Sequence, residues 1–180
     1  MPIGNTIQLG SGLKVHALAH GFGAEVSGID LTRPLDDATA AAIRDIWIEA
    51  GLLLVRDPGA DDDAQMRLSR VFGDMEPAAT ADMNDPKNQF MMTLAYDPAD
   101  TGARFQADYS FGGQDRAAYI PWHWDQSFMP TIVRGAVLRM EKPAQTMGRT
   151  GFIDAIEAYE RLSPEMQARI DRMEVVYHFV

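Results

Sequence analysis

The sequence predicts a single α+β domain in which strands outnumber helices. Apolar residues alternate with other residues over positions 13–18, and positions 24–29 follow a glycine-marked turn as a second strand. Apolar side chains recur at helical spacing over positions 43–50, which indicates a helix with one buried face. A chain of 180 residues with 46% hydrophobic residues can form one core, but is short for two. We therefore expect one domain, mainly β, over residues 1–180.

Two helices and a short strand are expected in the first half of the chain. One of the aspartates at 36–37 can cap a helix that ends at Gly51. Residues 52–55 are all apolar, which predicts a buried strand. A second helix should begin at one of the aspartates at 61–63 and stop at Gly73.

The second half is predicted to consist mainly of strands and loops. Residues 74–88 and 97–118 are rich in loop-forming residues, and loops of the latter length often carry binding residues. Ser163 followed by Pro164 is typical of a helix start, with serine as the cap. Further expected strands cover residues 89–96, 119–125, 132–140, 150–153 and 175–180, and a helix covers 155–162.

Composition argues against several classes of function. The net charge of −10 and the lack of a long basic stretch argue against nucleic acid and anionic membrane surfaces as partners. The absence of cysteine excludes disulfides, thiolate metal sites and a cysteine nucleophile, so a metal would need His, Asp, Glu or water as ligands. Neither a signal-peptide pattern nor a membrane-length apolar run is visible, so a cytoplasmic location is expected.

The motif Trp122-His123-Trp124-Asp125 carries the strongest chemical signal. On a strand, residues i and i+2 point to the same face, so His123 and Asp125 could bind one metal ion. Together with a second histidine, such a pair forms the facial triad of non-haem Fe(II) oxygenases, whose open positions can take a 2-oxo acid and O2. The motif is short, however, and a histidine hydrogen-bonded to a neighbouring aspartate on a half-buried strand is equally consistent with it.

The wider sequence resembles the taurine dioxygenase / 2,4-dichlorophenoxyacetate dioxygenase family. The resemblance implies a double-stranded β-helix, or jelly roll, with flanking helices. It also implies an Fe(II)- and 2-oxoglutarate-dependent dioxygenase that hydroxylates a small, anionic organic substrate with O2, while 2-oxoglutarate is decarboxylated to succinate. The matching stretches occur in family order at residues 23–35, 51–57, 69–73, 122–128, 148–152 and 158–164.

The resemblance also implies roles for individual residues. His123 and Asp125 match the proximal metal ligands, Thr150 the hydroxyl residue that binds the 2-oxoglutarate carboxylate, and Tyr119 a polar substrate contact. Trp124 replaces a small Ser or Thr, and we expect it to face away from the metal and pack. The family's Gly-Gly-Asp/Asn-Thr is Met-Gly-Arg-Thr here, which alters the turn before Thr150.

The distal histidine ligand and the arginine that binds 2-oxoglutarate have no counterpart in the chain. Relatives place both of them downstream of the position of Val180, and His178 does not match the distal ligand. We therefore expect an incomplete dioxygenase domain that lacks its C-terminal strands in this chain and is able to form a homo-oligomer. The alternatives are a non-catalytic jelly-roll binding module, an inactive fragment, or a jelly-roll metalloenzyme with a different reaction.

Overall fold

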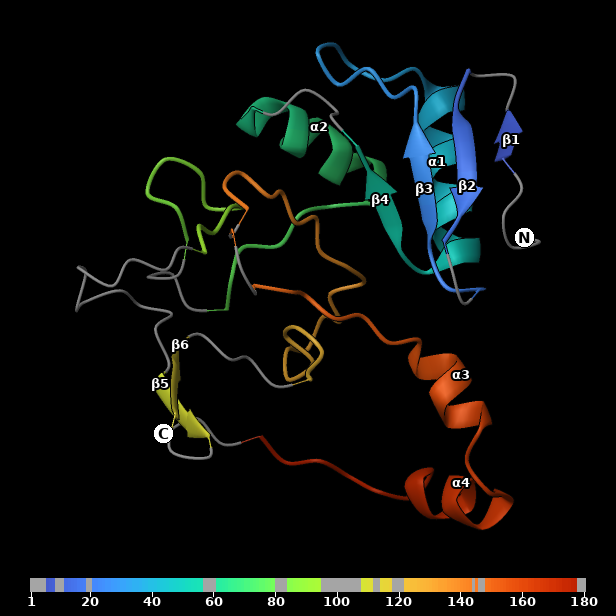
Figure 1. Ribbon diagram of the computed structural model, residues 1–180, viewed down its shortest axis with the longest axis vertical. Coiled ribbons are helices and arrows are strands. Elements are labelled where there is room, and N and C mark those ends of the chain that lie inside the picture. Colours follow the sequence, from blue (N-terminus) through green and yellow to red (C-terminus); the bar gives the residue numbers. More distant parts are fainter. Residues whose placement is uncertain are drawn as a thin grey trace. The chain divides into compact units, whose positions relative to one another are not determined.

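The chain forms two compact units, and each is described here by itself. The first unit comprises Met1–Gly73 and Val137–Val180, and the second comprises Asp74–Ala136. Within them, the computed structural model describes residues 6–8, 12–18, 21–56, 61–79, 84–94, 108–111, 114–117, 122–143, 145 and 148–177 (Figure 1).

A small mixed sheet forms the centre of the first unit. Its strands are β1 (Thr6–Gln8), β2 (Lys14–Ala17), β3 (Ala24–Ser27) and β4 (Leu53–Val55). They lie in the order β1-β2-β3-β4, with β2 antiparallel to both β1 and β3, and β3 parallel to β4. The predicted strands at 13–18 and 24–29 are thereby confirmed, whereas β1 was not predicted. The predicted strand at 52–55 is half-buried instead of buried, because β4 has a neighbour on one side only.

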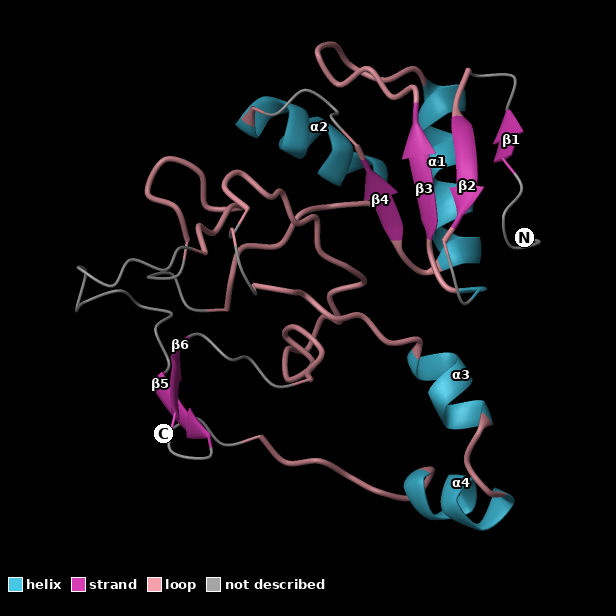
Figure 2. Ribbon diagram, viewed as in Figure 1, coloured by secondary structure: helices cyan, strands magenta, loops and turns pink. Residues whose placement is uncertain are grey.

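The helix α1 (Asp37–Ala50) joins the two parallel strands and begins and ends where the sequence predicts (Figure 2). The Asp36 side chain accepts hydrogen bonds from the backbone N–H and the hydroxyl of Thr39, both at 2.8 Å. These donations lower the pKa of the Asp36 carboxyl, because they stabilise its charged form. At the other end, Gly51 adopts a left-handed conformation with φ 73°, and its N–H donates to the Trp47 carbonyl at 2.8 Å.

The helix α2 (Asp62–Val71) is capped by the side chain of Asp61, which accepts from the Ala64 N–H at 2.6 Å. The helix ends at Phe72 in a right-handed conformation, so the prediction that Gly73 stops it was wrong by one residue. The Phe72 ring meets that of Trp47 edge-on at 5.0 Å between centroids, which links the ends of α1 and α2.

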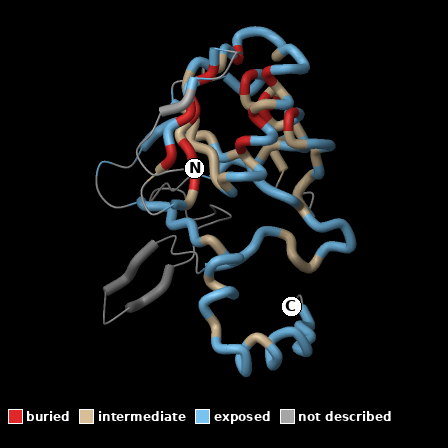
Figure 3. Tube along the Cα trace, turned by 90° about the vertical axis from the view of Figure 1, so that its right-hand side faces the viewer, coloured by how far each residue is buried: buried red, intermediate tan, exposed pale blue. Residues whose placement is uncertain are grey.

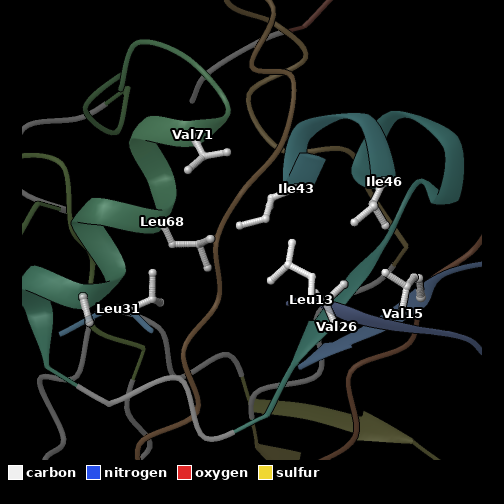
Figure 4. Packing of buried hydrophobic residues seen from close by; sticks show 10 residues of the cluster. Leu13, Val15, Val26, Leu31, Ile43, Ile46, Leu68 and Val71 are labelled. Carbon is white, nitrogen blue, oxygen red and sulfur yellow. The ribbon is translucent and has the colours of Figure 1, made fainter. Parts of the chain in front are cut away.

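The core of the first unit lies among the sheet, α1 and α2. Figure 4 shows buried side chains of β2, β3, α1 and α2 pointing toward one another, and Figure 3 shows how few residues elsewhere are buried. None of the described residues leaves a buried side-chain polar atom without a hydrogen bond. The buried cluster consists of Leu13, Val15, Ala24, Val26, Leu31, Ile43, Ile46, Ala64, Leu68 and Val71.

Side-chain hydrogen bonds and an ion pair hold the segment after residue 136 against α2. The Gln65 amide donates to the Val137 carbonyl at 2.9 Å, and Arg139 donates to the Gln65 side chain at 3.0 Å and also binds Asp62. Val137 packs against the core, whereas Leu138 and Met140 are exposed. Exposure thus alternates over residues 137–140, but the strand predicted over 132–140 does not form, because none of the described segments pairs with it.

The other predicted strands of the second half are likewise not found among the described residues. Residues 89–94, 122–125, 150–153 and 175–177 lack strand structure, while residues 95–96, 119–121 and 178–180 lie outside the described part. The loop predicted over 97–118 instead contains a hairpin of β5 (Asp108–Phe111) and β6 (Gln114–Ala117) in the second unit.

Two short helices follow in the first unit, and both were predicted, the second of them from its serine cap. They are α3 (Ala155–Glu160), capped by Asp154, and α4 (Pro164–Ile170), capped by Ser163. The Tyr159 hydroxyl donates to the Asp171 carboxylate at 2.7 Å, and this bond raises the pKa of Tyr159 by stabilising its protonated form. In the portion of the chain that the structure describes, no helix combines the length and apolarity needed to cross a membrane.

The substitution Gly51→Ala should lower the free energy of unfolding by about 1–2 kcal/mol, because an L side chain is strained at this φ. An added Cβ would also lie 2.9 Å from the ring of Phe22. Urea denaturation measures the change. Gly21→Ala is the matched control, since its φ of 77° carries the backbone cost with no atom within 4 Å of the added Cβ. Wild-type stability in Gly51→Ala would contradict the left-handed cap.

Candidate metal centre

The side chains of His123 and Asp125 meet in the second unit. The distance between His123 Nε2 and Asp125 Oδ1 is 2.8 Å, and the two side chains are 51% and 58% exposed. Residues 123–124 have no regular secondary structure and a turn begins at 125, so the predicted strand end was wrong. The expected convergence of the two side chains is nevertheless present.

The turn that follows Asp125 depends on one unusual backbone conformation. Gln126 has φ 50°, and it is the only non-glycine residue with positive φ among those described. Its carbonyl accepts a hydrogen bond from the Met129 N–H at 3.0 Å, which closes the turn. Nothing in the sequence signals this residue, because a left-handed conformation at a glutamine follows from its surroundings.

The geometry of the pair suits two neighbouring ligands of one metal ion. Ligands about 2.1 Å from an octahedral ion and at right angles to each other lie about 3.0 Å apart. The observed separation of 2.8 Å is close to that value, and without a metal the two atoms form a hydrogen bond at this distance. An imidazole nitrogen and a carboxylate oxygen also form the donor set expected for non-haem Fe(II). His123 and Asp125 therefore fit the metal as two of its ligands. Among the described residues, however, no group of three or more His, Cys, Asp or Glu side chains could hold a metal ion.

The other residues with predicted roles are described apart from this pair or lie outside the described part of the chain. Thr150 belongs to the first unit, where it is exposed and follows Gly148, a residue with φ 63°. Tyr119 and His178 lie outside the described residues. Of the predicted site residues, His123 and Asp125 therefore meet within the second unit, and Thr150 is described in the first unit.

Trp124 does not pack as predicted. It is 63% exposed, and its indole N–H donates to the Val133 carbonyl at 3.4 Å. Its neighbour Trp122 is 68% exposed. The prediction of a packed residue was therefore wrong, because the loop around the pair offers the Trp124 ring a polar contact and little apolar surface.

Comparison with known proteins identifies the family. The sequence model described as "Taurine catabolism dioxygenase TauD, TfdA family" matches residues 14–180, which include the metal pair and Thr150. The chain belongs to this family. The resemblance seen in the six sequence stretches is thereby confirmed.

Several individual relatives are 25–29% identical to this member of the family over the aligned residues. An (S)-phenoxypropionate/alpha-ketoglutarate-dioxygenase of Sphingobium herbicidovorans is 29% identical over 153 residues, covering 85% of this chain and 49% of the relative. The pentalenolactone F synthase of Streptomyces avermitilis is 27% identical over 83% of this chain and 47% of its own. An alpha-ketoglutarate-dependent sulfate ester dioxygenase of Pseudomonas putida is 25% identical over 92% and 49%. The chain thus spans about half the length of the curated relatives it matches.

A solved structure is also similar over a short region. It is the crystal structure of AAD-2 in complex with Mn(II) and N-oxalylglycine, with 28% sequence identity and a TM-score of 0.34. The similarity covers 36% of this chain and 25% of that one.

Substitutions at Gln126 should test the turn that holds the pair. Gln126→Val should lower the free energy of unfolding by about 1 kcal/mol or more, because β-branched residues avoid positive φ. Gln126→Asn is the matched control and should retain stability, since asparagine tolerates this conformation. Urea denaturation of both variants gives the comparison, and equal stability would argue against the left-handed turn.

Proposed function

We propose that this TauD/TfdA-family protein is an Fe(II)- and 2-oxoglutarate-dependent dioxygenase that hydroxylates a small, anionic organic substrate. The observation that carries the proposal is the contact at 2.8 Å between His123 Nε2 and Asp125 Oδ1. It lies within the family match, and its donor atoms suit two adjacent positions on Fe(II). Bound there, Fe(II) and 2-oxoglutarate would supply the oxygen activation, with 2-oxoglutarate converted to succinate and CO2.

Each proposed site residue has a distinct role. The neutral imidazole of His123 and the carboxylate of Asp125 hold the metal and leave other positions open for 2-oxoglutarate and O2. The hydroxyl of Thr150 donates a hydrogen bond to a 2-oxoglutarate carboxylate, and Tyr119 contacts the substrate. The last two roles are supported by the family resemblance of the surrounding sequence.

The names of the relatives support an anionic substrate. They refer to phenoxypropionate, sulfate esters and sulfonates, all of which carry an acidic group. The chain itself has a net charge of −10, so binding an anion requires local positive charge at the substrate site. We propose this substrate class for the intact protein, in a cytoplasmic setting.

We further propose that residues 1–180 form part of one jelly-roll domain whose metal site is completed by residues outside this chain. Among the described residues no third His, Asp or Glu joins the pair, and the curated relatives are about twice as long. Large apolar side chains of the first unit are also exposed, as expected of a domain that continues. These exposed side chains include Leu138, Met140, Phe152, Ile153, Ile156, Val175 and Val176.

Removing either ligand should abolish the metal site of the intact protein. In His123→Ala and Asp125→Ala, 2-oxoglutarate turnover should fall by more than about 100-fold, because each change removes a direct ligand. Anaerobic titration with Fe(II) and 2-oxoglutarate should lose the charge-transfer band of a chelated 2-oxo acid. His16→Ala, an exposed histidine on β2, is the matched control and should keep both signals. A variant of either ligand that retains half the turnover would refute the assignment, and absence of the band in the parent protein would favour a non-catalytic module.

The isolated 180-residue chain should show no 2-oxoglutarate turnover and should self-associate. Two protein ligands hold Fe(II) weakly, and exposed apolar side chains favour association. Turnover and molecular mass by light scattering should be compared between this chain and the full-length gene product. An active, stable monomer would show that a residue within 1–180, such as His178, completes the site.

A further inference from the structure

We propose that Trp124 is a positioning residue for the metal ligands and acts through its indole N–H. This inference rests on the proposed metal-binding function of His123 and Asp125. Trp124 lies between the two ligands in the sequence, and its indole N–H donates to the Val133 carbonyl, nine positions further along the chain. The bond therefore closes the loop that carries Asp125 and the turn after it.

Two of the hydrogen bonds of this loop lie one inside the other. The outer bond joins Trp124 Nε1 to the Val133 carbonyl at 3.4 Å, and the inner bond joins the Met129 N–H to the Gln126 carbonyl at 3.0 Å. The inner bond fixes the turn, in which Gln126 has φ 50°. The outer bond fixes the residue where the loop begins. Together they limit the conformations that the ligand loop can adopt before a metal binds.

Fixing Trp124 also fixes the directions of its neighbours. His123 and Asp125 adjoin Trp124 in the backbone, so a bond that restrains Trp124 also restrains the backbone from which both flanking side chains project. The flanking side chains are His123 and Asp125, and their donor atoms lie 2.8 Å apart. Ligands that already converge bind a metal more tightly, because less conformational entropy is lost on binding.

The exposure of Trp124 identifies the indole N–H as the group that acts. The residue is 63% exposed, so burial of its ring contributes little to stability. Trp122, on the other side of His123, is similarly exposed at 68%, and the structure gives its indole no hydrogen bond among the described residues. The two tryptophans therefore form a matched pair that differs in this hydrogen bond.

The test compares Mn(II) binding by the intact apoprotein and two variants, using electron paramagnetic resonance of free and bound Mn(II). Trp124→Phe keeps an aromatic ring but removes the donor, and should raise the Kd for Mn(II) by about two- to tenfold, the effect of one lost hydrogen bond. Trp122→Phe should leave the Kd unchanged. The urea midpoints of the two apoproteins should agree, because a general structural role for Trp124 would lower the midpoint of Trp124→Phe alone.

A second measurement uses the unsubstituted protein, so its result does not depend on whether a variant folds. In the nitrogen-proton NMR spectrum of the apoprotein, the indole N–H of Trp124 should exchange with solvent more slowly than that of Trp122. Equal exchange rates, or equal Mn(II) affinity of the two variants, would overturn the role of Trp124. If the parent protein binds no Mn(II), or binds it equally well after His123→Ala, the proposed metal centre fails. If Mn(II) binding by the parent protein depends on His123 but not on Trp124, the proposed metal centre stands and only the role of Trp124 is rejected.

Discussion

The parallel pairing of β3 with β4 is the constraint on which the first unit depends. Neighbouring parallel strands cannot be joined by a tight turn, so the chain must cross over between them, and α1 makes that crossing. Nine residues separate β3 from the start of α1, and two residues separate the end of α1 from β4. The Asp36 cap and the left-handed Gly51 provide those two ends. The buried faces of Ile43 and Ile46 then meet the sheet and complete the core.

Polar side chains extend this core by holding segments that lack strand pairing. Arg44 donates to the Val71 carbonyl at the end of α2, and Arg67 donates to the Leu31 carbonyl in the loop after β3. Gln65 holds the Val137 carbonyl in the same manner. Each of these bonds satisfies a backbone carbonyl outside the regular hydrogen-bond ladders. Helix α2 thus connects parts of the first unit that are far apart in the sequence.

His123 and Asp125 lie on a loop and a turn, whereas the core of the first unit is built on a sheet. Loop-borne ligands require local bonds to hold them, and the contacts of Trp124 and Gln126 are two such bonds among the described residues. In the proposed metal site, two protein ligands would leave most of the coordination sphere to water and cosubstrate. This open arrangement suits oxygen activation, but it makes tight metal binding depend on the rest of the protein.

The sequence by itself determined the helices, the first two predicted strands and the convergence of His123 with Asp125. A helix cap is a contact over three or four residues, so the caps at Asp36, Asp61 and Ser163 could be predicted from the neighbouring sequence alone. The short spacing of His123 and Asp125 likewise made their convergence predictable. The stretches that match the family in order then led to the hypothesis that the two residues bind a metal.

Only the tertiary structure decided which of the predicted strands form. A strand is completed by a partner, and residues 132–140 have none among the described segments, whereas 108–117 form a hairpin within a stretch predicted as loop. The positive φ of Gln126 and the bond from Trp124 to Val133 were also invisible in the sequence. Both arise because the surrounding loop, rather than the residue type, fixes where the backbone turns and what the indole can reach.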